Sequence, residues 1–132
     1  MSTLELNGRV FDASTTGTLT LTSEGGNATT DVTQGLVKGW INLDGSGTIG
    51  ISDSNNVGSV TDNSTGNYTV TFSNAMSNSL YATAGIHSAN SSFDANFRAL
   101  PNATTNMLFH TQAGGAVTDP DIVTALAAGD LA

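Results

Sequence analysis

Two segments in which apolar and polar residues alternate, Val37–Leu43 and Tyr68–Phe72, constrain the fold more than any other feature of the chain. Successive side chains of a β-strand point to opposite faces of its sheet, so this period of two indicates strands with one buried face. The turn-forming residues of Asp44–Gly47 follow the first segment, and those of Asp62–Gly66 precede the second. The two segments therefore predict strands of an antiparallel sheet.

Other parts of the chain carry similar but weaker alternation, separated by turn signals about every 8–12 residues. These candidate strands are Leu4–Leu6, Arg9–Phe11, Thr18–Thr22, Thr48–Ser52, Val57–Thr61, Leu80–Ile86, Asp94–Leu100 and Asn106–Gln112. Many short strands at such spacing are typical of sandwiches and barrels. The sequence predicts an all-β fold, an antiparallel β-sandwich or barrel-like domain.

The C-terminal segment has a different pattern, which predicts a short helix. Asp119 is suited to cap its first turn, Pro120 to its first position, and Gly129 to its end. The apolar face of this helix would comprise Ile122, Val123 and Leu126. A helix of two or three turns is marginal alone, so we expect it to dock on its own domain or on a neighbouring subunit.

These patterns divide the chain into three parts. Residues 1–34 are expected to form an N-terminal β arm or attachment segment, with a hairpin turn at Asn7–Gly8. Residues 35–118 form the β-sandwich core module, and residues 119–132 the short C-terminal helix. The chain contains no cysteine, so its stability must come from packing and from association with other chains.

Charge and hydropathy argue against two classes of partner. Three basic residues stand against eleven acidic residues, which gives a net charge of −8. Nucleic acids and anionic membranes are bound by clustered Lys and Arg, so neither is an expected partner. The N-terminal residues Met1–Leu6 lack the basic and apolar regions of a secretory signal, and no apolar run reaches transmembrane length. We expect synthesis in a host cytoplasm without secretion.

The sequence offers no recognisable catalytic centre. Its two histidines, His87 and His110, lie in candidate strands, and no Gly-x-Ser-x-Gly motif is present. Asp53–Asn55 and Asp119–Asp121 place oxygen ligands at alternate positions, as calcium loops do, but neither continues as an EF-hand loop. Turn and cap roles explain these carboxylates better, with calcium binding as the alternative. We expect a protein that is not an enzyme and that uses no cofactor.

The aromatic residues are few, and most are expected in the core. Trp40 lies on the strand face opposite Ile41, so it is a candidate for an interface contact or a sugar-stacking platform. Tyr81 is the second candidate for stacking on a glycan. The apolar face of the expected helix, Ile122, Val123 and Leu126, supplies further candidate interface contacts.

The segment from Leu36 to about Met76 resembles a module of tail-fibre and virion surface proteins of marine tailed phages. The similarity is carried by ordered motifs: Lys38, Trp40, Asn42, Asp44, Gly45, Gly47, Thr48, Ser54, Asn56, Val57, Thr61, Asp62, Asn63, Thr65, Gly66, Tyr68, Thr69, Val70 and Phe72. The region from Ser88 to Ala132 lies outside the resemblance, and so does the long shaft of a full fibre.

This resemblance implies a non-enzymatic structural protein of a tailed-phage virion, a surface-displayed fibre-like or capsid decoration β module. Its partners would be other capsid or tail proteins, and phage appendages with this module imply a homotrimer on the virion surface. The alternative is a carbohydrate-binding host-receptor module of a tail fibre, in which Trp40 or Tyr81 stacks on a host surface glycan. A glycosidase has less support, because no carboxylate pair is identifiable.

Overall fold

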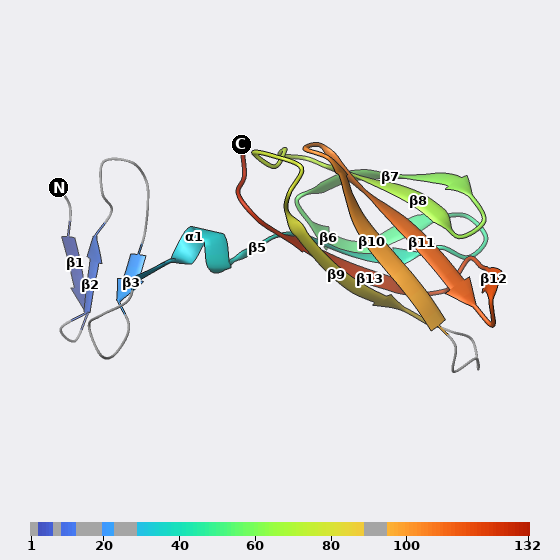
Figure 1. The fold of residues 1–132 in the computed structure, drawn as a ribbon, viewed down its shortest axis with the longest axis horizontal. Helices are drawn as coiled ribbons and strands as arrows, with labels where there is room; N and C mark the ends of the chain where they lie inside the picture. The colour runs from blue at the N-terminus through green and yellow to red at the C-terminus, as the bar shows by residue number, and fades with distance from the viewer. Residues whose placement is uncertain (1–2, 7–8, 13–19, 23–28, 89–94) are drawn as a thin grey trace. The chain divides into compact units, whose positions relative to one another are not determined.

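The fold is shown in Figure 1 as a computed structural model that describes residues 3–6, 9–12, 20–22, 29–88 and 95–132. The chain forms two compact units, Met1–Leu36 and Val37–Ala132. The second unit contains two antiparallel β-sheets that pack as a sandwich, so the all-β prediction is confirmed.

The described residues of the N-terminal unit form two short antiparallel strand pairs and one helical turn. The pairs are β1 (Thr3–Leu6) with β2 (Arg9–Asp12), and β3 (Thr20–Thr22) with β4 (Thr29–Asp31); the turn is α1 (Val32–Gly35). The expected pairing of Leu4–Leu6 with Arg9–Phe11 is present. The turn predicted at Asn7–Gly8 lies outside the described residues, as do Thr18 and Leu19.

The C-terminal unit contains the sandwich. One sheet has the order β6-β5-β13-β9, with β5 at Val37–Asp44, β6 at Gly50–Asn55, β9 at Ala82–His87 and β13 at Val123–Ala128. The other has the order β10-β11-β8-β7, with β7 at Val57–Ser64, β8 at Asn67–Phe72, β10 at Ala95–Ala103 and β11 at Asn106–Ala113. A short strand, β12 (Ala116–Val117), pairs with the end of β11.

The two sheets are joined along both edges. At one edge the chain passes from β6 to β7 through Asn56 alone, whose φ of 56° is in the left-handed region that Asn tolerates. The backbone N–H of Asn74 donates to the Asn56 side-chain oxygen at 2.7 Å and stabilises this bend. At the other edge the Thr83 hydroxyl of β9 donates to the carbonyl of Ala99 in β10 at 2.6 Å. These links hold the edges of the two sheets together.

Alternating residues of the central strands fill the space between the sheets. The buried side chains are Ile41 and Leu43 from β5, Tyr68, Val70 and Phe72 from β8, Met107, Phe109 and Thr111 from β11, and Val123, Ala125 and Ala127 from β13. The prediction that Tyr68–Phe72 presents its apolar face to the core is confirmed. Burial of this apolar surface is the main stabilising contribution to the fold.

The prediction of a C-terminal helix in residues 119–132 is wrong. Val123–Ala128 instead forms β13, a central strand that pairs with β5 on one side and β9 on the other. A helix there would leave the backbone groups of β5 and β9 without this partner. As a strand, the same residues satisfy both neighbours and bury every second side chain, and such tertiary context overrides local helix signals.

Asp119, predicted as the cap of that helix, joins two other parts of the sandwich unit. Its Oδ1 accepts hydrogen bonds from the Tyr68 hydroxyl at 2.6 Å and from the Gly66 N–H at 2.7 Å. The next residue, Pro120, accepts the N–H of Gly45 at 3.0 Å. The segment before β13 is thereby tied to a turn of each sheet.

Both tyrosines should resist ionisation in the folded protein. Burial raises the pKa of Tyr68 and of Tyr81 above the ordinary tyrosine value, and the hydrogen bond to Asp119 raises that of Tyr68 further. An unfolded chain ionises its tyrosines near pH 10. The unfolded state therefore loses protons first, and the free energy of unfolding should fall as the pH rises above about 10.

An alkaline titration followed by phenolate absorbance and circular dichroism checks this pH dependence. We expect phenolate to form in the same step as the loss of the β signal. Full phenolate formation near pH 10 in a protein that keeps its β spectrum would contradict it.

Candidate functional site

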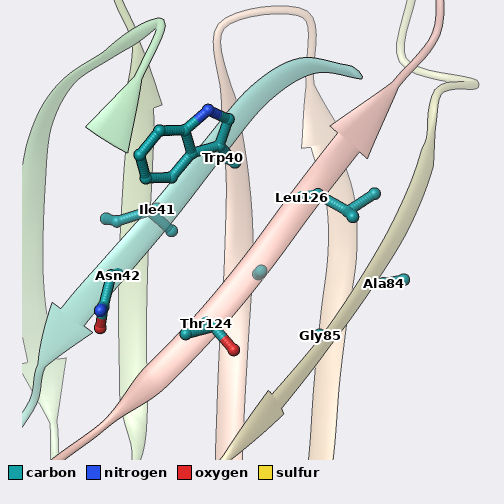
Figure 2. Close-up of a pocket in the computed structure, with 8 residues that line it drawn as sticks. Trp40, Ile41, Asn42, Ala84, Gly85, Thr124 and Leu126 are labelled. Carbon is teal, nitrogen blue, oxygen red and sulfur yellow. The ribbon is translucent and has the colours of Figure 1, made fainter. Parts of the chain in front are cut away.

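The outer face of the sheet β6-β5-β13-β9 carries a shallow hollow of about 370 Å³. We call it the outer groove. It is lined by residues of β5, β9 and β13: Trp40, Ile41, Asn42, Ala84, Gly85, Thr124, Ala125 and Leu126. Figure 2 shows these three strands side by side, with the labelled residues distributed over all of them.

Strand register arranges the groove in two rows. Leu126 of β13 lies opposite Trp40 of β5 and, on its other side, opposite Ala84 of β9, which makes an apolar row. Two residues along β13, Thr124 lies opposite Asn42 of β5, which places two polar side chains together, and on its other side it lies opposite the exposed Ile86 of β9. Figure 2 shows the Trp40 and Leu126 side chains at one end of the hollow and Asn42 and Thr124 at the other.

The floor of the groove depends on a glycine. Ile41 and Ala125 turn their side chains into the core, so they contribute mainly backbone to the outer surface. A Cβ at Gly85 would overlap the Phe97 ring and lie 2.5 Å from the Thr124 carbonyl oxygen. Gly85 therefore lets Phe97 pack beneath β9 and allows β9 and β13 to approach closely.

The groove is uncharged and retains hydrogen-bonding capacity. Trp40 is 37% exposed and Leu126 is 38% exposed. All eight lining residues are uncharged. Within the described part of the chain, the side chains of Trp40, Asn42 and Thr124 make no hydrogen bond, so the indole N–H, the amide and the hydroxyl can serve a ligand. An apolar platform beside polar groups fits a neutral, hydroxyl-rich ligand.

The structure brings together only two of the five candidate contact residues, Trp40 and Leu126. Ile122 is exposed but precedes β13 and lies outside the groove lining. Val123 is buried and faces the core, because the predicted helical face does not exist in a strand. Alternation along β5 alone places Asn42 on the Trp40 face, whereas Ala84 and Thr124 could be found only from the register between strands.

Tyr81 is buried, which corrects its expected role as a glycan platform. Its ring packs edge-on against Phe72 with the ring centroids 5.6 Å apart. Its hydroxyl donates to the backbone carbonyl of Asn106 at 2.5 Å and lies 3.2 Å from that of Ala103. Both the ring and the hydroxyl of Tyr81 therefore make their contacts inside the sandwich.

The histidines lie in different environments. His87 is buried, and its ring nitrogens face the backbone carbonyls of Ser88 at 2.6 Å, Gln112 at 3.0 Å and Asn96 at 3.2 Å. This arrangement ties β9 to the opposite sheet and offers no nucleophile for the imidazole to activate. His110 is half-buried on β11.

The residues that the structure describes lack two other kinds of site. No three His, Cys, Asp or Glu side chains in those segments are grouped so that they could hold a metal ion. In the same segments, no helix combines the length and hydropathy needed to span a membrane. Asp44, a carboxylate predicted in a turn, accepts the N–H of Ser46 at 2.9 Å as an Asx-turn does.

Comparison with protein-family models, with curated proteins and with solved structures finds no match for this chain.

Proposed function

We propose that this chain is a non-enzymatic structural protein of a tailed-phage virion, displayed on the particle surface as a fibre-like or capsid decoration module. The observation that carries the proposal is the position of the phage-like motifs in the fold. The segment from Leu36 to Met76 supplies β5 to β8, which belong to both sheets. The segment that carries the resemblance therefore contributes strands to both sheets of the sandwich.

Individual motif residues have structural reasons to occur where they do. Gly47 and Gly66 adopt positive φ angles of 60° and 69° in their turns, which favour glycine. Tyr68, Val70 and Phe72 fill the core. These turn and core roles support a stable module that could be displayed on a particle surface. None of them involves a catalytic group.

We propose that the N-terminal unit, Met1–Leu36, serves for attachment to other capsid or tail proteins, and that the protein assembles as a homotrimer. A closed rotational assembly is the usual arrangement of identical subunits. Sedimentation equilibrium of the full chain tests the assembly, and a monomer at all concentrations would contradict it.

Fractionation of phage particles tests the proposed location. Particles of the phage that encodes this chain are purified on a density gradient, and their proteins are identified by mass spectrometry. We expect the chain in the particle band at a fixed ratio to the major capsid protein. Its recovery only from the soluble fraction of the lysate would contradict a virion role.

The outer groove favours a second candidate function, binding of a host surface glycan. Trp40 offers a half-exposed ring, and Asn42 and Thr124 offer hydrogen bonds beside it. We expect Trp40→Ala to weaken glycan binding at least about fivefold, since stacking on an aromatic ring contributes about 1 kcal/mol beyond buried area.

A glycan array with the full chain measures this loss, with Leu80→Ala as the matched control. Leu80 is 89% exposed and lies outside the groove, so its truncation also removes apolar surface without touching Trp40. Binding that survives Trp40→Ala unchanged, or an array without any bound glycan, would contradict this second function.

A further inference from the structure

A second hollow, of about 190 Å³, lies on the other sheet of the sandwich, β10-β11-β8-β7. It is lined by Asn96 and Arg98 of β10, His110 and Gln112 of β11, and Val117 of β12. We call it the Arg98 pocket. Neither the phage resemblance nor the proposed glycan groove accounts for it.

Strand register places the polar residues of the Arg98 pocket in opposed pairs. Arg98 lies directly opposite His110, and Asn96 directly opposite Gln112. Directly opposed residues of an antiparallel pair project from the same face, and positions two residues apart share that face as well. Val117 lies opposite Gln112 on its other side and also lines the pocket.

The Arg98 pocket contains one of the few positively charged side chains of the protein. Arg98 is one of only three Lys or Arg residues in a chain with a net charge of −8, and it stands beside one of the two histidines. Within the described segments, the side chains of Asn96, Arg98, His110 and Gln112 make no hydrogen bond or ion pair with the protein. Their donors are open to a ligand.

These groups match an acidic sugar. The guanidinium of Arg presents a planar fork that binds a carboxylate through two parallel hydrogen bonds. A histidine ring provides an N–H donor even when it is neutral, and amides both donate to and accept from hydroxyl groups. Val117 supplies an apolar contact for the C–H groups of a sugar ring. Net negative charge repels anions at a distance, so recognition must rest on these close contacts.

We propose that the Arg98 pocket binds the carboxylate of an acidic sugar residue, such as a uronic acid of a surface polysaccharide. Arg98 pairs with the carboxylate, His110 donates a further hydrogen bond, and Asn96 and Gln112 contact neighbouring hydroxyls. This inference does not depend on the virion assignment, because the purified full chain either binds the sugar or does not.

The test is a titration of the isotopically labelled full chain, followed by amide chemical shifts in NMR spectra. Methyl galacturonoside is the ligand, and methyl galactoside, which lacks only the carboxylate, is its neutral counterpart. We expect shifts centred on β10, β11 and β12 with the acidic sugar and none there with the neutral one. Arg98→Gln should weaken binding at least about tenfold, as loss of a charged hydrogen-bonding partner does.

The matched control is Lys38→Gln, which removes the same charge from β5 of the other sheet and should leave the affinity unchanged. Arg98→Lys keeps the charge without the fork and should give intermediate affinity. Equal binding of both sugars, equal losses in Arg98→Gln and Lys38→Gln, or equal shifts with inorganic phosphate would overturn the proposal. Absence of any shift with the acidic sugar would overturn it too.

Discussion

Replacing Phe72 by alanine is expected to lower the free energy of unfolding by about 3–5 kcal/mol. The Phe72 side chain is only 6% exposed and packs edge-on against Tyr81. Its ring also reaches across the sandwich, because a Cβ at Gly39 of β5 would lie 3.2 Å from Phe72 Cε1. Truncation would therefore leave a cavity between the two sheets, and the backbone of β5 and β8 limits how far that cavity can collapse.

Urea unfolding followed by circular dichroism measures this change. Ile86→Ala is the control, since Ile86 is an exposed apolar residue of β9. We expect the control to unfold near the parent midpoint, while the midpoint of Phe72→Ala falls by at least about 1 M urea. Equal midpoints for Phe72→Ala and the parent would contradict the position of Phe72 in the core.

The second large effect is expected for Asp119→Ala, at about 2–4 kcal/mol, because two donors lose one shared acceptor. The Tyr68 hydroxyl lies in the core, and without Asp119 its remaining acceptor is the Gly45 carbonyl at 3.5 Å. The Gly66 N–H loses its 2.7 Å partner as well. The tie between the segment before β13 and the turns of both sheets would be weakened.

Asp121→Ala is the matched control, because Asp121 is exposed two residues further on and its truncation removes the same charge. A double-mutant cycle with Tyr68→Phe isolates the hydroxyl–carboxylate interaction. We expect the double variant to lose less unfolding free energy than the sum of the losses of the two single variants. Strict additivity, or an Asp119→Ala protein as stable as Asp121→Ala, would contradict the role of this contact.

The sequence was sufficient to predict the β-sandwich because period-two alternation is a local signal. Tyr68–Phe72 buries its three large residues as the pattern requires. The same reasoning was wrong at the C-terminus, where Asp119, Pro120 and Gly129 match helix-end signals. Val123, Ala125 and Ala127 alternate with the residues between them, but alanine is a weak signal because it occurs on both buried and exposed faces. The two strands that pair with β13, β5 and β9, are also remote from it in sequence.

The candidate sites depend on information that a single sequence does not carry. Trp40 could be placed on an outer face from its own strand pattern, and it lies there. Its neighbours Ala84 and Leu126 come from strands whose register with β5 is set by tertiary pairing. Tyr81 could not be assigned to the core, because it precedes β9 and its hydroxyl partners belong to the end of a distant hairpin. Neither residue type nor spacing indicates such contacts.

Immunogold electron microscopy of intact phage particles tests the central claim, display on the virion surface, most directly. Antibodies raised against residues 37–132 are applied to unfixed particles, with antibodies against an internal virion protein as the control. We expect gold at one defined part of the particle, the tail or the capsid, without disruption of the particle. Labelling that appears only after the particles are disrupted, or no labelling at all, would contradict it.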